Sequence, residues 1–171
     1  EIRDGDGLTR RNYLTMTVAA AGPGGYELQS SASDIPYRYD ANGNIQSMPA
    51  PTGPGTFVID PVDVLFRFPL QAGASWSAGT REVGPSFVRN AENLVTVVGW
   101  ESLQVPAGTF QAMKISKVAT KAWEPFPGQS MRSKRLTNVW FVPALRTYAR
   151  YETLEVTQAG VVLLDQTWEL D

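Results

Sequence analysis

Turn signals recur along this 171-residue chain at spacings that suit β-strands and leave little room for helices. Glycine, proline and asparagine gather at residues 22–25, 41–44, 106–108, 124–128 and 159–160. The runs between them alternate apolar and polar residues or are rich in β-branched and aromatic side chains, as strands are. No stretch keeps the 3.6-residue period of an amphipathic helix. We therefore predict an all-β fold, an antiparallel meander that forms a strongly curved sheet or incomplete barrel with little helix.

The most informative segment is residues 94–123, in which two strand-like runs flank Pro106-Ala107-Gly108. Proline has the φ required at the second position of a type I turn, and Gly108 can take the positive φ that closes a short hairpin loop with a bulge. On the outgoing run, both the even-numbered and the odd-numbered residues include apolar side chains, and these two sets face opposite sides of the sheet. We therefore expect part of the sheet to be covered on both faces, with Phe110 in the core.

The remaining chain supplies further strand-like runs, and we expect a meander of about nine strands from all of them together. They are predicted at residues 12–21, 26–33, 37–40, 45–48, 75–83, 131–142, 146–158 and 161–170. Residues 49–56 are rich in proline and glycine, and we predict that they form an extended crossover over the surface. A single helical turn is expected at residues 61–66 and nowhere else. The length suits one domain, residues 1–171, with a charged N-terminal segment at residues 1–11.

Composition excludes several classes of chemistry. The chain has no cysteine and no histidine, and so it lacks thiol nucleophiles, disulfides and the commonest general base. Its 15 basic and 17 acidic residues give a net charge of −2, which provides no general attraction for nucleic acid. The one basic cluster, Arg132, Lys134 and Arg135, is divided between the two faces of a predicted strand. We expect no nucleic-acid partner, no cofactor and no transmembrane segment, since no run of about 18 apolar residues occurs.

Two loops have the oxygen-rich composition of calcium loops but the wrong spacing. In Asp4-Gly5-Asp6-Gly7, taking the last glycine as the turn glycine would place the first ligand on Ile2. Asp40, Asn42 and Asn44 are followed by neither a suitable glycine nor a late acidic residue. We interpret the first loop as a solvated terminus and the second as a hairpin turn, and we predict no metal site.

Catalytic arrangements are hard to build from this sequence. A lysine can activate a serine without histidine, but no glycine elbow or third group accompanies Ser116 and its neighbours Lys114 and Lys117. Two carboxylates about 5–9 Å apart could hydrolyse a glycoside. The candidates on predicted strands are Glu101, Glu152, Glu155 and Asp165. Solvated sheet faces explain these acids better, and we predict no catalytic residue.

Tryptophan provides the strongest functional hint. The chain has five, namely Trp76, Trp100, Trp123, Trp140 and Trp168. Large aromatic rings whose indole N–H needs a partner suit either a barrel core, which is the default, or the wall of an apolar cleft. If they line a cleft, the expected ligand-binding residues are Trp76, Trp100, Trp123 and Trp140.

Three segments carry a resemblance to a known family. Val105-Pro106-Ala107-Gly108-Thr109-Phe110 is similar to the V-P-A-G-T-F signature of uncharacterised Gram-negative periplasmic proteins and lipoproteins with a bent antiparallel sheet. Trp140-Phe141-Val142-Pro143 and Leu70-Gln71-Ala72-Gly73-Ala74-Ser75-Trp76 resemble two further segments of these proteins. The matches span residues 70–170. The family carries glycines after the second segment, whereas this chain has Ala144, Arg146 and Thr147.

The resemblance implies an exported protein, periplasmic or associated with the outer membrane, whose signal segment has been removed. It also implies a fold loosely akin to the half-barrel of lipoprotein carriers, which can hold an acyl chain. Our leading hypothesis is therefore a non-enzymatic envelope protein that binds an apolar or amphipathic ligand, such as a lipid, in a concave, aromatic-lined sheet. The alternative is an assembly module that recruits an envelope protein through a sheet face or edge. A glycan-acting enzyme comes third.

Overall fold

The structure is a computed structural model that describes residues 2–3, 9–10, 13–50, 53–126 and 128–171. In these residues a single antiparallel sheet has the strand order β2-β1-β13-β12-β11-β10-β9-β8-β7-β6-β5-β4-β3. From β3 to β13 every strand pairs with its successor in the sequence. The predicted all-β antiparallel meander is thus confirmed, and the strands of the described residues do not close into a barrel.

The strands agree closely with the predicted ranges. Their bounds are β1 Ile2–Arg3, β2 Thr9–Arg10, β3 Met16–Gly22, β4 Gly25–Ser30, β5 Tyr37–Asp40, β6 Ile45–Pro49, β7 Thr56–Asp60, β8 Ser75–Val83, β9 Val88–Val105, β10 Gly108–Phe126, β11 Gln129–Val142, β12 Thr147–Thr157 and β13 Val162–Glu169. The short strands β1, β2 and β7 were not predicted. Residues 4–7, which we interpreted as part of a solvated terminus, lie outside the described residues.

Helix is nearly absent from the described chain. The helical turn predicted at residues 61–66 is wrong, because this segment has no helical residue. Its backbone is held instead by side chains, since Asn44 accepts a hydrogen bond from Phe66 N and donates one to Phe66 O. The one short helix in the part of the chain that the structure describes is a 3₁₀ turn at Pro143–Leu145, between β11 and β12.

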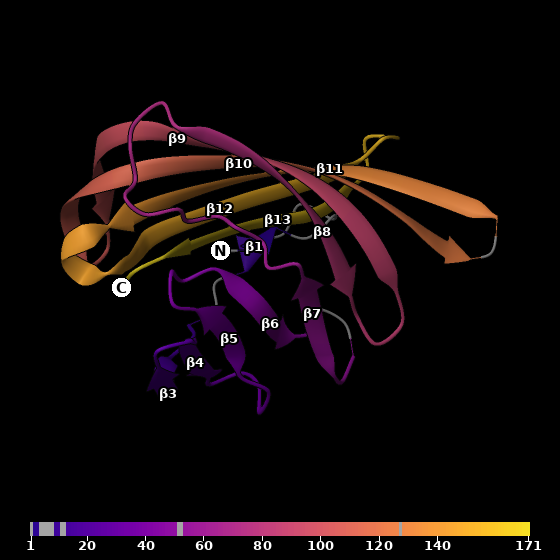
Figure 1. The fold of residues 1–171 in the computed structure, drawn as a ribbon, viewed down its shortest axis with the longest axis horizontal. Helices are drawn as coiled ribbons and strands as arrows, with labels where there is room; N and C mark the ends of the chain where they lie inside the picture. The colour runs from indigo at the N-terminus through magenta and orange to yellow at the C-terminus, as the bar shows by residue number, and fades with distance from the viewer. Residues whose placement is uncertain (1, 4–8, 11–12, 51–52, 127) are drawn as a thin grey trace.

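The sheet is folded over on itself (Figure 1). The long strands β8–β13 form an arch, and β3–β7 lie beneath it. We call the face of β8–β13 that faces β3–β7 the inner face, and the opposite face the outer face. Contacts agree with this arrangement: Tyr39 of β5 lies near Tyr148 and Tyr151 of β12, and the ring of Phe66, in the segment between β7 and β8, lies 5.5 Å from that of Phe141 in β11.

The central hairpin has the predicted turn, but its bulge lies elsewhere. Val105 pairs directly with Gly108, and so Pro106 and Ala107 form a two-residue loop. The bulge occurs in β9 opposite Lys114 and Ile115, where Val98 is the extra residue. One extra residue moves every later side chain of the strand to the other face. Odd-numbered residues of β9 therefore face inward before Val98 and outward after it.

This change of face divides the core into two clusters. The inner cluster consists of Phe66, Trp76, Val95, Val97, Met113, Ile115 and Val139. The outer cluster consists of Leu103, Val105, Ala112, Trp140, Val142 and Ala149. Leu170 packs against the outer cluster, and its backbone bonds Ala107 N at 3.1 Å and Ala149 O at 2.9 Å. As expected from the sequence, both faces of the sheet are covered for part of its length.

Residues 49–56 connect paired neighbours rather than crossing the surface. Ser47 of β6 pairs with Val58 of β7, so the proline-rich segment is a hairpin loop. Ala50 N bonds Gly55 O at 2.9 Å, and Gly55 has a φ of +117°. A glycine with positive φ can reverse the chain within a few residues. Proline and glycine are common both in such loops and in extended linkers, and so composition alone did not distinguish the two.

Gly108→Val is expected to destabilise the protein by about 1–3 kcal/mol. Gly108 has a φ of +133°, which is unfavourable for a residue with a branched side chain. The nearest atom to an added β-carbon lies 4.0 Å away, so the cost comes from the backbone and not from a clash. Thermal unfolding should show a melting temperature lower by about 2–4 °C per kcal/mol.

Gly22→Val is the matched control, because Gly22 has neither a positive φ nor a neighbour within 4 Å of an added β-carbon. Equal melting temperatures for the two variants would contradict the role given to Gly108.

Phe110 is half-buried and not fully buried as predicted. It packs on the edge of the outer cluster, so Phe110→Ala should cost less than the roughly 3–5 kcal/mol of a fully buried phenylalanine.

Candidate functional site

Five of the six tyrosines converge where β4 and β5 approach β12. We call this group the tyrosine cluster: Tyr26, Tyr37, Tyr39, Tyr148 and Tyr151. Tyr26 and Tyr39 are cross-strand partners whose rings stack at 5.0 Å. Tyr148 and Tyr151 contact each other at 5.9 Å on the inner face of β12. The cluster therefore joins two parts of the chain that are more than a hundred residues apart.

Burial raises the pKa of four of the five tyrosines in the cluster, Tyr26, Tyr37, Tyr39 and Tyr148. Burial, followed by the neighbouring tyrosines, raises the pKa of Tyr39 above its ordinary value. Tyr148 is 39% exposed, and its partial burial, followed by the other tyrosines, raises its pKa to about 12. Within the described residues, no hydrogen bond joins these hydroxyls to the protein. The one fully buried side-chain polar atom without a hydrogen bond in these residues is Asp63 Oδ1, and so the hydroxyls of the half-buried tyrosines reach solvent.

Three phenylalanines extend the aromatic surface beside the tyrosine cluster. Phe66, Phe68 and Phe141 pack together with ring centroids 5.4–6.1 Å apart. Phe141 pairs with Tyr148 across β11 and β12, so the two groups of rings are adjacent. Phe68 remains 47% exposed. The result is a surface that combines aromatic rings with hydroxyls free to bond a ligand or water.

The four tryptophans predicted to bind a ligand are not brought together. Trp76 lies in the inner cluster, and its Nε1 donates to Val64 O at 2.8 Å. Trp140 lies in the outer cluster, on the opposite face, and its Nε1 donates to Glu101 at 2.8 Å. Trp100 is 58% exposed, and Trp123 lies far along β10 toward the β10–β11 turn. Only Trp76 belongs to the core that supports the tyrosine cluster, through Phe66.

The inner face also contains an ionic cluster, which we define as Glu82, Arg89, Lys121, Arg135 and Glu155. Lys121 Nζ lies 2.9 Å from Glu82 Oε1 and 3.9 Å from Glu155 Oε2. Arg89 pairs with Glu82, and Arg135 donates from Nε to Glu155 at 2.5 Å. The side chains of Lys121 and Glu155 are each 2% exposed. The group links five successive strands, β8 to β12, at one level of the sheet.

Three cations share two carboxylates in the ionic cluster, and burial together with these charges sets the direction of each pKa shift. Burial alone would raise the pKa of Glu82, but Lys121 and Arg89 outweigh it and hold that pKa below its ordinary value. Burial is likewise outweighed at Glu155, whose pKa Arg135 and Lys121 lower. Burial and repulsion by Arg135 lower the pKa of Lys121 to about 7, against the attraction of Glu82. The cluster can therefore reach charge balance by releasing one proton from Lys121.

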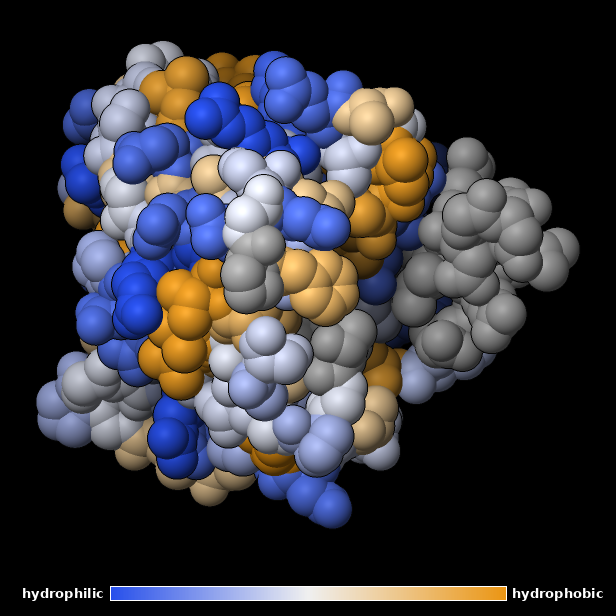
Figure 2. Space-filling model, turned by 90° about the vertical axis from the view of Figure 1, so that its right-hand side faces the viewer, coloured by the Kyte–Doolittle hydropathy of each residue, from blue (hydrophilic) through white to orange (hydrophobic). Residues whose placement is uncertain are grey.

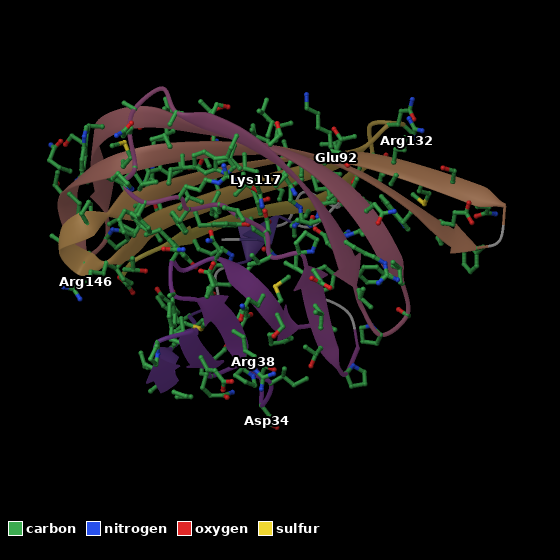
Figure 3. All side chains as sticks on the ribbon, in the orientation of Figure 1. Asp34, Arg38, Glu92, Lys117, Arg132 and Arg146 are labelled. Carbon is green, nitrogen blue, oxygen red and sulfur yellow. The ribbon has the colours of Figure 1, made fainter. Side chains whose placement is uncertain are left out.

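A second ion pair lies next to this cluster on the inner face. Lys117 lies four residues before Lys121 on the same face of β10. Its side chain pairs with Asp63, in the segment before β8. Figure 3 shows Lys117 on the inner side of the long strands, whereas Arg132 lies on the outer side. Arg132 and Lys134 are exposed while Arg135 belongs to the ionic cluster, so the basic residues are divided between the faces as predicted.

The serine–lysine arrangement considered from the sequence does not form. Lys114 lies 3.5 Å from Glu101 and 4.9 Å from the ring of Trp140, and Lys117 is on the other face with Asp63. Of the four candidate acids, Glu155 is buried in the ionic cluster and Glu101 bonds Trp140. Glu155 lies near Glu82 in the ionic cluster, because Lys121 contacts both. Glu82 was not among the four candidates.

A groove of about 750 Å³ lies at the end of the molecule that carries the β8–β9 and β10–β11 turns. It is lined by Gly84, Pro85, Ser86, Phe87, Val88, Asn90, Ala122, Trp123, Glu124 and Ser130. Figure 2 views this end of the molecule and shows hydrophobic and hydrophilic surface interspersed. The lining combines two rings with polar groups, and it includes one of the four predicted tryptophans.

Sequence reasoning missed the tyrosine cluster because its members are ordinary strand residues. Tyr37 and Tyr39 stand at spacing i, i+2 in the short run YRYD, which places both on one face of a strand. Tyr148 and Tyr151 are three apart and share a face through the register shift that makes Ala149 the extra residue of β12. The spacing of Tyr37 and Tyr39 could have been recognised in the sequence. The shared face of Tyr148 and Tyr151 could not, because it depends on an irregularity of the backbone.

Other features bear on the class of site. In the described part of the chain no group of three acidic side chains could hold a metal ion. Within the same residues, no helix has the length and hydropathy needed to cross a membrane. No family model matches the chain, and neither a curated protein nor a solved structure matches it.

Proposed function

We propose that this protein binds an amphipathic small molecule at the tyrosine cluster, without catalysing a reaction. The observation that carries the proposal is the convergence of five tyrosines whose hydroxyls have no protein partner in the described residues. Their rings, with Phe68 and Phe141, offer apolar area to a hydrocarbon chain or ring system. Their hydroxyls offer neutral hydrogen-bonding groups to the polar part of the ligand.

The tyrosines with raised pKa values offer neutral hydroxyls, which can donate a hydrogen bond to a neutral or an anionic polar group of a ligand. The raised pKa values of Tyr26, Tyr37, Tyr39 and Tyr148 keep these groups protonated at neutral pH. The carboxylates of the ionic cluster, which is also on the inner face, are already paired with the cations of that cluster. An envelope location, periplasmic or at the outer membrane, is part of the proposal and rests on the resemblance of residues 70–170. Lipids are the class of amphipathic molecule that such a location supplies.

Tyr148→Ala is expected to weaken binding of a fluorescent medium-chain fatty acid, dansyl-undecanoic acid, by tenfold or more, about 1.4 kcal/mol. Tyr148 is 39% exposed, so its truncation should remove ligand contact with little loss of stability. The measurement is a fluorescence titration, accompanied by a thermal melt of each variant. Tyr13→Ala is the matched control, because Tyr13 is 80% exposed and lies outside the cluster.

Tyr148→Phe separates the ring from the hydroxyl and should give an intermediate affinity. Native mass spectrometry of protein isolated from its own host then identifies the ligand class by the mass of a co-purified molecule. Equal affinities for Tyr148→Ala and Tyr13→Ala would place any binding site elsewhere. Failure of the wild type to bind the probe, combined with no co-purified molecule, would refute the proposal.

A further inference from the structure

The turn between β12 and β13 is followed by three consecutive aliphatic residues that the fold leaves exposed. Val161, Val162 and Leu163 are 58%, 46% and 44% exposed. Single exposed aliphatic residues are common on protein surfaces, whereas a contiguous group with polar neighbours marks a place of interaction. The end of this hairpin therefore has the composition of a contact surface.

The aliphatic surface continues from the turn across the outer face of β12 and β11. Val162 pairs with Val156 of β12, and Leu154 of β12 pairs with Leu136 of β11. Leu154 and Val156 face outward, because Glu155 between them is buried on the inner face. Leu154 and Leu136 are 40% and 41% exposed. We call the surface formed by these residues the aliphatic corner: Leu136, Leu154, Val156, Val161, Val162 and Leu163.

Two cations without an acidic partner lie beside the aliphatic corner. Lys134 of β11 pairs in register with Val156, and the backbone oxygen of Arg132 accepts a hydrogen bond from Gln158 N in the turn, at 3.1 Å. Both side chains are exposed, and Arg132 points away from the outer side of the sheet (Figure 3). Within the described residues neither cation forms an ion pair, and the exposed Glu124 of β10 pairs with neither of them.

We propose that the aliphatic corner, with Arg132 and Lys134, docks on the surface of a membrane that contains anionic lipids. Aliphatic side chains gain free energy when they enter the boundary between headgroups and acyl chains, and basic residues beside them are attracted to anionic headgroups. The charges favour this partner, because cations without acids next to exposed aliphatic residues complement a surface that is anionic outside and apolar beneath. The proposal does not rest on ligand binding at the tyrosine cluster.

Docking of this kind should be reversible and sensitive to salt. The whole chain has a net charge of −2, so attraction to an anionic surface depends on the local arrangement of Arg132 and Lys134. Each basic residue near such a surface strengthens binding by about fivefold. Because both cations are exposed, salt should screen this contribution.

Co-sedimentation with lipid vesicles measures the docking. Vesicles made of equal parts of phosphatidylcholine and phosphatidylglycerol should bind the wild type about tenfold or more strongly than vesicles of phosphatidylcholine alone. The difference should shrink between low and physiological ionic strength. Absence of the protein from both vesicle pellets, or equal binding to the two compositions, overturns the proposal.

A double variant tests the cations. Arg132→Gln with Lys134→Gln should weaken binding to the anionic vesicles by about tenfold or more. Arg81→Gln with Arg146→Gln is the matched control, because it also removes two exposed cations that have no ion pair in the described residues. The two double variants have the same net charge. Equal loss of binding in both would show that total charge and not this corner attracts the protein, which overturns the proposal.

A second double variant tests the aliphatic residues. Val161→Ser with Leu163→Ser should also weaken binding to the anionic vesicles by about tenfold or more, since both side chains are proposed to enter the lipid. Met16→Ser with Val18→Ser is the control, because these residues of β3 are 40% and 63% exposed. All four positions are exposed, so melting temperatures should stay close to that of the wild type. Unchanged binding in the Val161 and Leu163 variant overturns the proposal.

The tyrosine-cluster variant separates docking from ligand uptake. Tyr148→Ala should sediment with the anionic vesicles as the wild type does, because Tyr148 lies on the inner face and the aliphatic corner is at the β12–β13 turn. Loss of vesicle binding in this variant would show that lipid is bound at the tyrosine cluster instead, and it overturns docking by the corner. Wild-type protein that sediments with vesicles but does not bind dansyl-undecanoic acid contradicts only the proposed ligand site.

Discussion

Replacing Glu155 by glutamine is expected to lower the free energy of unfolding by about 3–5 kcal/mol, the cost of removing one partner from a buried ion pair. Its carboxylate is 2% exposed and accepts hydrogen bonds from Ser133 and Arg135, each at 2.5 Å. Without its charge, Arg89, Lys121 and Arg135 would share Glu82 alone. Urea unfolding monitored by tryptophan fluorescence measures the change.

Lys121→Met should cost much less, under about half of the Glu155→Gln value, although Lys121 is just as deeply buried. Its removal leaves two arginines paired with two carboxylates, because Arg89 pairs with Glu82 and Arg135 with Glu155. Replacing a buried charge by an apolar side chain of similar length is often tolerated when the remaining charges balance. Equal costs for the two variants would contradict the charge count on which this expectation rests.

The dependence of stability on pH tests the same cluster. The pKa of Lys121 is about 7 in the folded protein, below its ordinary 10.5, so above pH 7 the unfolded chain binds more protons at this site and stability rises with pH. Lys121→Met should abolish this rise between pH 7 and about pH 10, where tyrosine ionisation begins to act. Glu82 and Glu155 have lowered pKa values, and the stability they provide is complete above about pH 4.5 and is lost as pH falls through their folded-state pKa.

Most of the fold could be predicted because its determinants are local. Pro106 and Gly108 mark the central turn, and alternation correctly assigned the faces of β10, with Met113, Ile115 and Lys117 on one side. The division into two cores could not be predicted, because it depends on a bulge at Val98. Nothing in the run LVTVVGW marks this valine as the extra residue except the glycine that follows it, which has a φ of +149°.

The candidate site was less predictable than the fold, since it depends on how far the sheet bends. A flat meander would keep β4 and β5 far from β12, eight and seven places away in the strand order. Curvature was expected, but sequence patterns do not give its extent, and only a sheet folded over on itself brings Tyr39 close to Tyr148. The five tryptophans were the candidates in the sequence, whereas the structure brings five tyrosines together.

Trp140→Ala is expected to destabilise the protein by about 3–5 kcal/mol, the cost of truncating a buried aromatic side chain. Trp140 is 5% exposed and bonds Glu101 through its Nε1. Its ring also lies 4.9 Å from Lys114 Nζ and 5.6 Å from the Arg150 guanidinium carbon, so two cations lose a favourable contact. The melting temperature should fall by several degrees, and thermal denaturation followed by circular dichroism measures the shift.

Trp100→Ala is the matched control, because Trp100 is a tryptophan of the same sheet, in β9, but is 58% exposed, and its removal should change stability by no more than about 0.5 kcal/mol. Both tryptophans were candidate ligand-binding residues, and the fatty-acid titration separates this role from a structural one. If Trp140 is structural, the folded fraction of Trp140→Ala binds dansyl-undecanoic acid as the wild type does, because Trp140 lies on the outer face and the tyrosine cluster on the inner face. A variant with wild-type melting but no binding would instead place the ligand site on the outer face.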